Sequence, residues 1–74
     1  MSGTATSGLG HIEISPADLA IMSLVASGHT NMAISQVLEM SPRNVGGRIR
    51  AVQDLLTAPT KVAAVVMLIR EGRL

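Results

Sequence analysis

The chain has 74 residues and a mass of 7.7 kDa, enough for one small domain, which at this size usually needs a disulfide, a metal or a partner subunit for added support. Cysteine and aromatic residues are absent, which excludes disulfides, thiolate metal sites, thiol catalysis and base stacking on aromatic platforms. Three carboxylates without Lys or Arg give residues 1–39 a net charge of −3, whereas six basic and two acidic side chains give residues 40–74 a net charge of +4, so contact with an anionic partner is expected in the second half.

The first predicted elements are a flexible tail and a helix. Residues 1–13 are assigned to a tail and lead-in, because residues 1–10 are mostly Gly, Ser and Thr and cannot bury enough apolar surface to become ordered. Ser15 as an N-cap, followed by a proline, predicts a helix over residues 16–27 that ends at Gly28. Its expected buried face is Leu19, Met22, Val25 and Ala26.

A second and a third helix follow, separated by a short turn. Thr30 can cap a helix over residues 31–38, and Ser41, again followed by a proline, can cap another over residues 42–56. Two helices joined by so short a turn must cross steeply, which is helix-turn-helix geometry. The expected buried residues are Ile34, Val37 and Leu38 in the second helix and Val45, Ile49, Val52 and Leu56 in the third. Those expected to point outward from the third helix are Arg43, Gly47, Arg50 and Asp54.

A fourth helix, capped by Thr60, is expected to run through Glu71 and to end at Gly72. It is apolar nearly all round, and a domain this small cannot bury both faces against one core. One face is therefore expected to meet a second subunit, and this homodimer contact is assigned to Ala64, Met67 and Leu68, beside a stripe of Val62, Val65, Val66 and Ile69. No strand-like alternation occurs, so the predicted fold class is all-α with four helices.

Short sequence runs follow one another at fixed spacing from Ile14 to the end of the chain. They are I-S-P-A-D at 14–18, V-A-S-G-H-T-N at 25–31, I-S-Q-V-L-E-M-S at 34–41 and R-E-G-R-L at 70–74. In their joint spacing, without a gap, they resemble the LuxR-type (GerE-type) helix-turn-helix domain of bacterial transcription regulators. The resemblance implies that residues 14–74 form a four-helix domain that binds duplex DNA, with its third helix in the major groove and its fourth helix commonly in a dimer contact.

The resemblance also implies roles for individual residues. Phosphates would be held at the start of the second helix and at the start of the third, and base edges would be read from the positions of Gly46, Gly47 and Arg50. The implied DNA-contact set is Thr30, Asn31, Ser41, Arg43, Asn44, Gly46, Gly47 and Arg50. In this chain two of the three base-reading positions have no side chain, and basic residues frequent in the family are missing at Gly46, Met32 and Leu55.

Several of these residues also have purely structural interpretations. Arg50 could contact a guanine edge, a pairing that contributes about 1–3 kcal/mol, or it could be a solvated arginine on an outward face. Gly46 and Gly47 each cost a helix roughly 1 kcal/mol relative to Ala, which indicates either close backbone approach to a partner or simple loss of a side chain. Arg48 lies off the outward face and is expected to pair locally, and His29 is expected to pack in a turn.

The preferred hypothesis is a small cytoplasmic transcription regulator, of bacterial or phage type, that binds duplex DNA as a homodimer without metal or cofactor. The alternative is a LuxR-like module that sequesters or modulates another regulator without specific DNA binding; the low net charge and the two adjacent glycines favour this alternative. Catalysis is not expected, because useful carboxylate pairs, cysteine and a phosphate-binding glycine loop are all missing. A membrane span is not expected either, because the longest apolar stretch, residues 62–69, is far shorter than about 20 residues.

Overall fold

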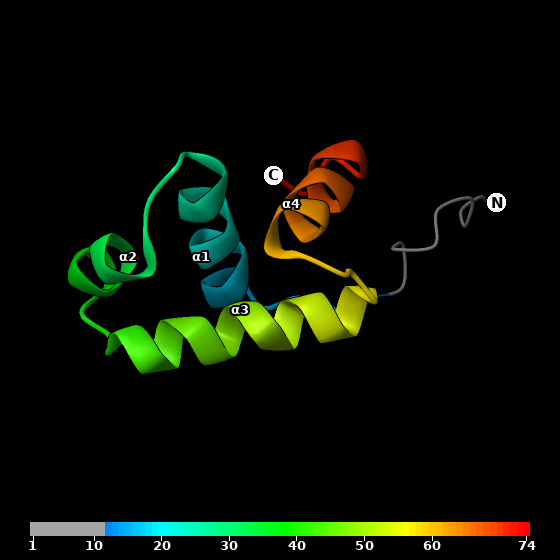
Figure 1. Ribbon diagram of the computed structural model, residues 1–74. Helices are drawn as coiled ribbons and strands as arrows, with labels where there is room; N and C mark the ends of the chain where they lie inside the picture. The colour runs from blue at the N-terminus through cyan, green and yellow to red at the C-terminus, as the bar shows by residue number, and fades with distance from the viewer. Residues whose placement is uncertain (1–11) are drawn as a thin grey trace, which may run out of the picture.

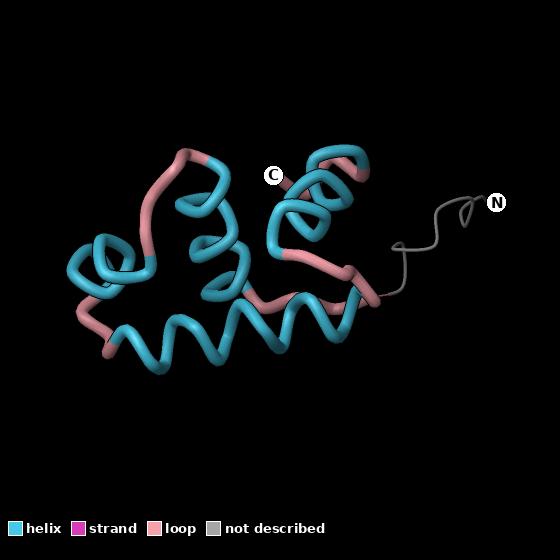
Figure 2. The backbone as a smooth tube through the Cα atoms, viewed as in Figure 1, coloured by secondary structure: helices cyan, strands magenta, loops and turns pink. Residues whose placement is uncertain are grey.

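A computed structural model describes residues 12–74; the expected tail, residues 1–10, lies outside this range, as does His11. Four helices follow one another: α1 (Pro16–Ala26), α2 (Asn31–Leu38), α3 (Pro42–Leu56) and α4 (Lys61–Arg70) (Figure 1). Between residues 12 and 74 only helices and loops occur (Figure 2), so the predicted all-α, four-helix class is confirmed.

Each helix begins at a side-chain oxygen that caps it. The hydroxyl oxygens of Ser15 and Thr30 accept from the backbone N–H three residues further on, each at 3.1 Å, and those of Ser41 and Thr60 do the same at 3.0 Å. These bonds satisfy N–H groups that the first turn of a helix leaves without partners. All four predicted helix starts are therefore confirmed.

The helix ends also agree closely with the sequence. The first helix stops one residue before the predicted Ser27, which is its C-cap, and Gly28 follows with a φ of +91° in the left-handed region that glycine tolerates best. The fourth helix likewise stops one residue early, with Glu71 as its C-cap. Differences of one residue at a helix end are ordinary fraying.

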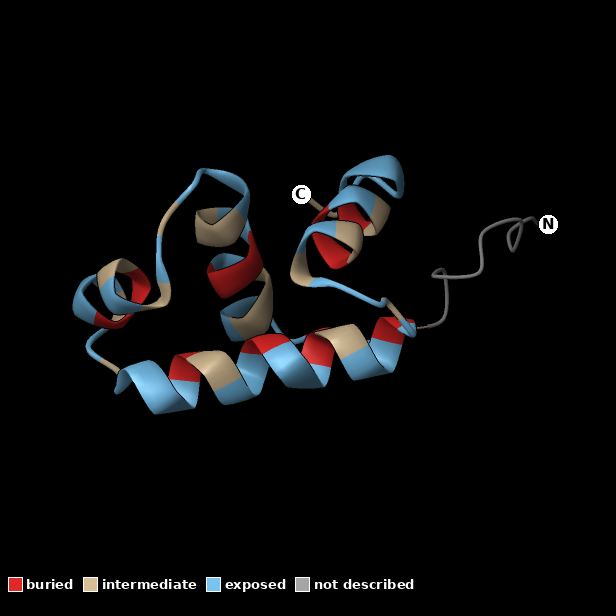
Figure 3. Cartoon of the chain, in the orientation of Figure 1, coloured by how far each residue is buried: buried red, intermediate tan, exposed pale blue. Residues whose placement is uncertain are grey.

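The third helix is the shared support of the domain. α1, α2 and α4 all pack against it, and Figure 3 shows its buried residues as a row along one side. That row is Val45, Ile49, Val52 and Leu56, the stripe predicted from the sequence. Beneath it, Ile21, Met22, Ile34 and Leu68 are the largest fully buried side chains from the other helices. The single core thus lies between α3 and the three helices on one side of it.

Two predictions of buried residues in the first two helices are wrong. Ala26, the last residue of α1, is exposed, although the periodicity places it on the buried face. Ile21 is buried instead, because α1 packs against three other helices and so buries a broader face than its apolar periodicity indicates. Val37 is 57% exposed, because α2 contacts α1 and α3 through the side that carries Ile34 and leaves Val37 facing away from both. Within α2, Ile34 is buried as predicted and Leu38 is partly buried.

The fourth helix buries in the core the side that the sequence analysis assigns to the dimer contact. Ala64 and Leu68 are fully buried in the core of the single chain, and Met67 is partly buried against it. The assignment of Ala64 and Leu68 to a dimer contact is therefore wrong, because their side chains are already covered by the chain's own helices. The exposed apolar residues of this helix are Val62, Val66 and Ile69, which are 68%, 38% and 53% exposed, and we call them the outer face of α4.

No single helix among residues 12–74 combines the length and the apolarity needed to cross a bilayer. Only α3 and α4 taken together across a 60° bend meet that test, by length and composition alone.

Replacement of Leu68 by Ala tests which side of α4 faces the core. We expect Leu68→Ala to lower the free energy of unfolding by about 2–5 kcal/mol, because it removes a fully buried side chain and leaves a cavity. The matched variant Ile69→Ala changes a neighbouring residue on the outer face and should cost far less. Urea denaturation of both variants is the measurement. Equal losses, or a larger loss for Ile69→Ala, would contradict the observed orientation of the helix.

Candidate nucleic-acid interface

The side of α3 opposite its buried stripe is open to solvent. Arg43, Gly47, Arg50 and Asp54 are all exposed there, as the sequence predicts. Residues 43, 47, 50 and 54 are three or four positions apart, which puts them on one face of a helix. Gly47, which has no side chain, lies at the centre of this surface, with Arg43 on one side of it and Arg50 on the other.

The starts of α2 and α3 flank this surface. The hydroxyl oxygens of Thr30 and Ser41 accept from backbone N–H groups inside the domain, yet both residues are exposed. Because a hydroxyl can donate and accept at the same time, each retains an O–H donor for an external oxygen. Asn44, whose N–H is held by Ser41, has an exposed side chain, whereas Asn31 is half-buried and its Oδ1 is buried without a hydrogen-bond partner in the described chain.

Neither glycine of α3 is required by packing inside the domain. A Cβ at Gly47 would meet nothing within 4 Å, and a Cβ at Gly46 would lie 3.5 Å from Nδ2 of Asn31, an ordinary van der Waals contact. Both residues nevertheless lie inside a helix, where glycine is unfavourable. A reason for the two glycines therefore has to be sought outside the folded chain, in a partner or in the absence of any need for a side chain.

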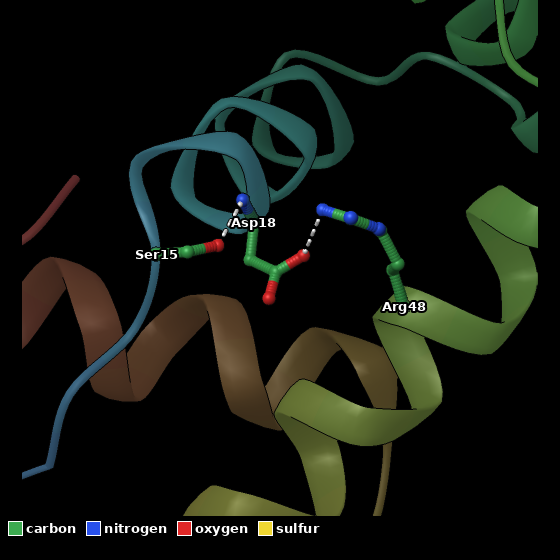
Figure 4. A network of polar contacts seen from close by, with 3 residues as sticks. All are labelled: Ser15, Asp18 and Arg48. Atoms are coloured by element: carbon green, nitrogen blue, oxygen red, sulfur yellow. Dashed lines mark hydrogen bonds and ion pairs between the residues drawn. The ribbon is translucent and has the colours of Figure 1, made fainter.

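The arginines of α3 differ in their partners. Arg48 donates through Nη1 to Oδ1 of Asp18 on α1 at 3.0 Å (Figure 4), so it does pair within the domain, although its partner is on another helix and is not a local one. Nε of Arg50 lies 3.9 Å from Oδ1 of Asp54 one turn further along α3. Arg43 makes no ion pair within residues 12–74. No local pattern in the sequence points to Asp18 as the partner, because it is 30 residues away from Arg48.

Within the turn between α1 and α2, the ring of His29 packs as expected. Its Nδ1 lies 3.1 Å from the backbone oxygen of Leu24, and the residue is half-buried. Across the described part of the chain, no group of three His, Cys, Asp or Glu side chains is arranged to hold a metal ion.

Substitution of Gly47 by Ala tests whether this glycine has a role inside the domain. Because the added Cβ meets open space, Gly47→Ala should stabilise the helix by roughly 1 kcal/mol and raise the thermal midpoint by about 4–8 °C. Gly28→Ala is the control and should lower the midpoint, because a φ of +91° is strained for Ala. Thermal denaturation followed by circular dichroism measures both. A lower midpoint for Gly47→Ala would show that the domain itself needs this glycine.

The arrangement described above agrees with a comparison with known families. The model of the family described as bacterial regulatory proteins, luxR family (GerE), matches residues 13–68, which include all of α1, α2 and α3 and most of α4. Comparisons with curated proteins and with solved structures gave no match. The family is one of DNA-binding transcription regulators with a helix-turn-helix domain. Because the match covers well over half of the 74 residues, this chain belongs to the LuxR family of bacterial regulatory proteins.

Proposed function

We propose that this chain is a cytoplasmic transcription regulator that binds duplex DNA as a homodimer, with α3 in the major groove. The observation that carries the proposal is the division of α3 into two sides. One side is buried against the other three helices, and the opposite side is exposed and carries Arg43 and Arg50. A helix whose far side is fully supported can enter a groove as a rigid element.

The size of α3 suits a major groove. With 15 residues it is about 22 Å long, and the groove of B-DNA is wide enough, at about 12 Å, to admit one helix. Arg50 is 77% exposed in its side chain and lies in the middle of the helix, where a guanidinium can reach a guanine edge. Arg43 lies in the first turn, where it would neutralise a phosphate.

The starts of α2 and α3 would fix the position of the domain on the DNA backbone. Helix N-termini carry partial positive charge and suit phosphate oxygens. At α2 the candidate contacts are Thr30 and Asn31, and at α3 they are Ser41 and Asn44. Such contacts set orientation and register without selecting a sequence.

The absence of side chains at Gly46 and Gly47 limits direct base recognition. With one arginine left to contact bases, each half-site would be distinguished only weakly. Dimer spacing and DNA shape would then supply much of the specificity. Weak recognition by each half-site therefore favours binding as a homodimer.

The outer face of α4 is the dimer contact that we propose in place of Ala64 and Leu68. Val62, Val66 and Ile69 are spaced as i, i+4 and i+7 and form one exposed apolar stripe. Three side chains cover far less than the roughly 800 Å² per partner of a standard interface. We therefore expect weak association of the free protein, strengthened when two copies are held on one DNA molecule.

A second candidate function is binding to another regulatory protein without specific DNA contact. Met32 and Val37 favour it, because both are 57% exposed on α2, a helix without a charged residue. A charge-free, partly apolar surface suits a protein partner better than a phosphate backbone. The experiments below separate the two functions.

Two arginine substitutions test DNA binding by α3. Arg50→Ala should weaken binding mainly to a preferred site, which reduces the difference in affinity between that site and random DNA. Arg43→Ala should weaken binding to all sequences alike and reduce the salt dependence of log K by about one unit, because one phosphate contact is lost. Fluorescence anisotropy with selected and random duplexes at several salt concentrations is the measurement.

Wild-type protein at low salt provides the control for this experiment. Non-specific attraction to phosphate is greatest there, so a DNA-binding domain must show at least that interaction. If wild type does not bind any duplex at low salt, the DNA proposal is wrong and the protein-binding function takes its place.

Substitution of Val66 by Glu tests the dimer contact. A carboxylate at the centre of the outer face of α4 would lose hydration without gaining a partner. We expect the dimer dissociation constant to rise about tenfold or more, both for free protein and for two copies bound to one duplex. Ser23→Glu, at an exposed position of α1, adds the same charge elsewhere and serves as the control. Sedimentation that shows wild type as a monomer at high concentration and also on DNA would exclude this contact.

A further inference from the structure

Most of the positive charge on α3 is compensated by the chain itself. Arg48 is held by Asp18 at 3.0 Å, and Arg50 has Asp54 at 3.9 Å. Arg43 has no acidic partner within residues 12–74. Three arginines and two paired carboxylates therefore leave one uncompensated positive charge on this helix.

The Asp18 carboxylate is fixed in place more firmly than that of Asp54. Figure 4 shows Asp18 in the first turn of α1, where its backbone N–H is held by the Ser15 cap and its side chain reaches Arg48 across to α3. The side chain of Asp18 is only 25% exposed, whereas that of Asp54 is 75% exposed. A phosphate that attracted Arg48 would thus still meet the carboxylate of Asp18 close by.

Compensated arginines contribute little to phosphate binding. Each phosphate that a protein neutralises releases counterions, which gives log K a dependence of about −0.9 per phosphate on log salt concentration. The negative charge of a carboxylate within 4 Å of an arginine cancels most of the positive potential that the arginine would produce at larger distances. Since the Debye length is about 8–10 Å at physiological salt, the effect is confined to the phosphates that this arginine would contact.

We propose that Asp18 and Asp54 limit the affinity of the domain for duplex DNA by neutralising the two exposed arginines Arg48 and Arg50, which leaves Arg43 as the main source of phosphate attraction on α3. The inference rests on the proposed DNA-binding function. Non-specific binding is almost entirely electrostatic, so the two carboxylates suppress binding to random sequences most strongly. Occupancy of a site then depends on base contact and on the pairing of two copies rather than on charge.

The variants Asp18→Asn and Asp54→Asn test the proposal, because they remove one negative charge each and keep the shape of the side chain. We expect each to bind random duplex DNA several-fold more tightly at about 0.1 M salt and to steepen the salt dependence of log K by about 0.9. The double variant Asp18→Asn/Arg48→Ala removes one charge of each sign and should return to the wild-type salt dependence. A gain of affinity cannot arise from unfolding, so it reports directly on the surface.

Glu71→Gln is the matched control for net charge. Glu71 is the exposed C-cap of α4, and Figure 1 shows the C-terminal end of this helix pointing away from α3. Its substitution by Gln makes the same change in total charge. If Asp18→Asn and Asp54→Asn bind no more tightly than Glu71→Gln while wild type binds DNA, the inference is wrong and the proposed function stands. If neither wild type nor any variant binds a duplex at low salt, both are wrong.

Discussion

The buried stripe of α3 is the contact on which the other three helices depend. Val45, Ile49, Val52 and Leu56 lie along one side of α3, and α1, α2 and α4 all pack on that side. A domain this small can form only one core, and this stripe is its centre. Because every supporting helix lies on the same side, the opposite side of α3 has to face outward. The candidate interface is therefore a direct consequence of how the core is formed.

The exposed side of α3 carries little uncompensated positive charge for a surface that binds nucleic acid. Two of the three arginines of α3, Arg48 and Arg50, are paired with carboxylates, and two central positions of the helix are glycines without a packing role. Such a surface suits modest attraction by each copy of the domain, combined with the association of two copies. The outer face of α4 is small and apolar, which suits the weak, DNA-assisted dimer that we propose.

The local parts of this structure could be predicted from the sequence, and the long-range parts could not. Helix starts depend on a hydroxyl residue and the residues directly after it, so all four N-caps were predicted correctly. The stripe of α3 was also predictable, because its apolar residues recur every three or four positions while the arginines and Asp54 lie at positions between them. The pair of Arg48 with Asp18 joins positions 30 residues apart, and only the packing of α1 on α3 reveals its partner.

Predictions failed where a helix is apolar nearly all round. In α4 almost any side could be buried, and the packing that places Ala64 and Leu68 in the core cannot be deduced from periodicity. In α1 the burial of Ile21 was missed for a related reason, because contact with three helices widens the buried face, while Ala26 at the end of the helix is exposed. Val37 shows the opposite case. This apolar residue is exposed because α2 packs only against α1 and α3, and no other helix covers its remaining side.

In the proposed complex, the outward side of α3 is the surface that contacts duplex DNA. Changes in amide chemical shifts, measured by NMR while a duplex is added at low salt, show which part of the domain contacts DNA. The amides of Gly46 and Gly47, in the first half of α3, report on the centre of the proposed surface. We expect the largest shifts in the first half of α3 and at the starts of α2 and α3, with small shifts in the second half of α1. Shifts concentrated on α2 around Val37, or no shifts at any DNA concentration, would contradict the proposed complex.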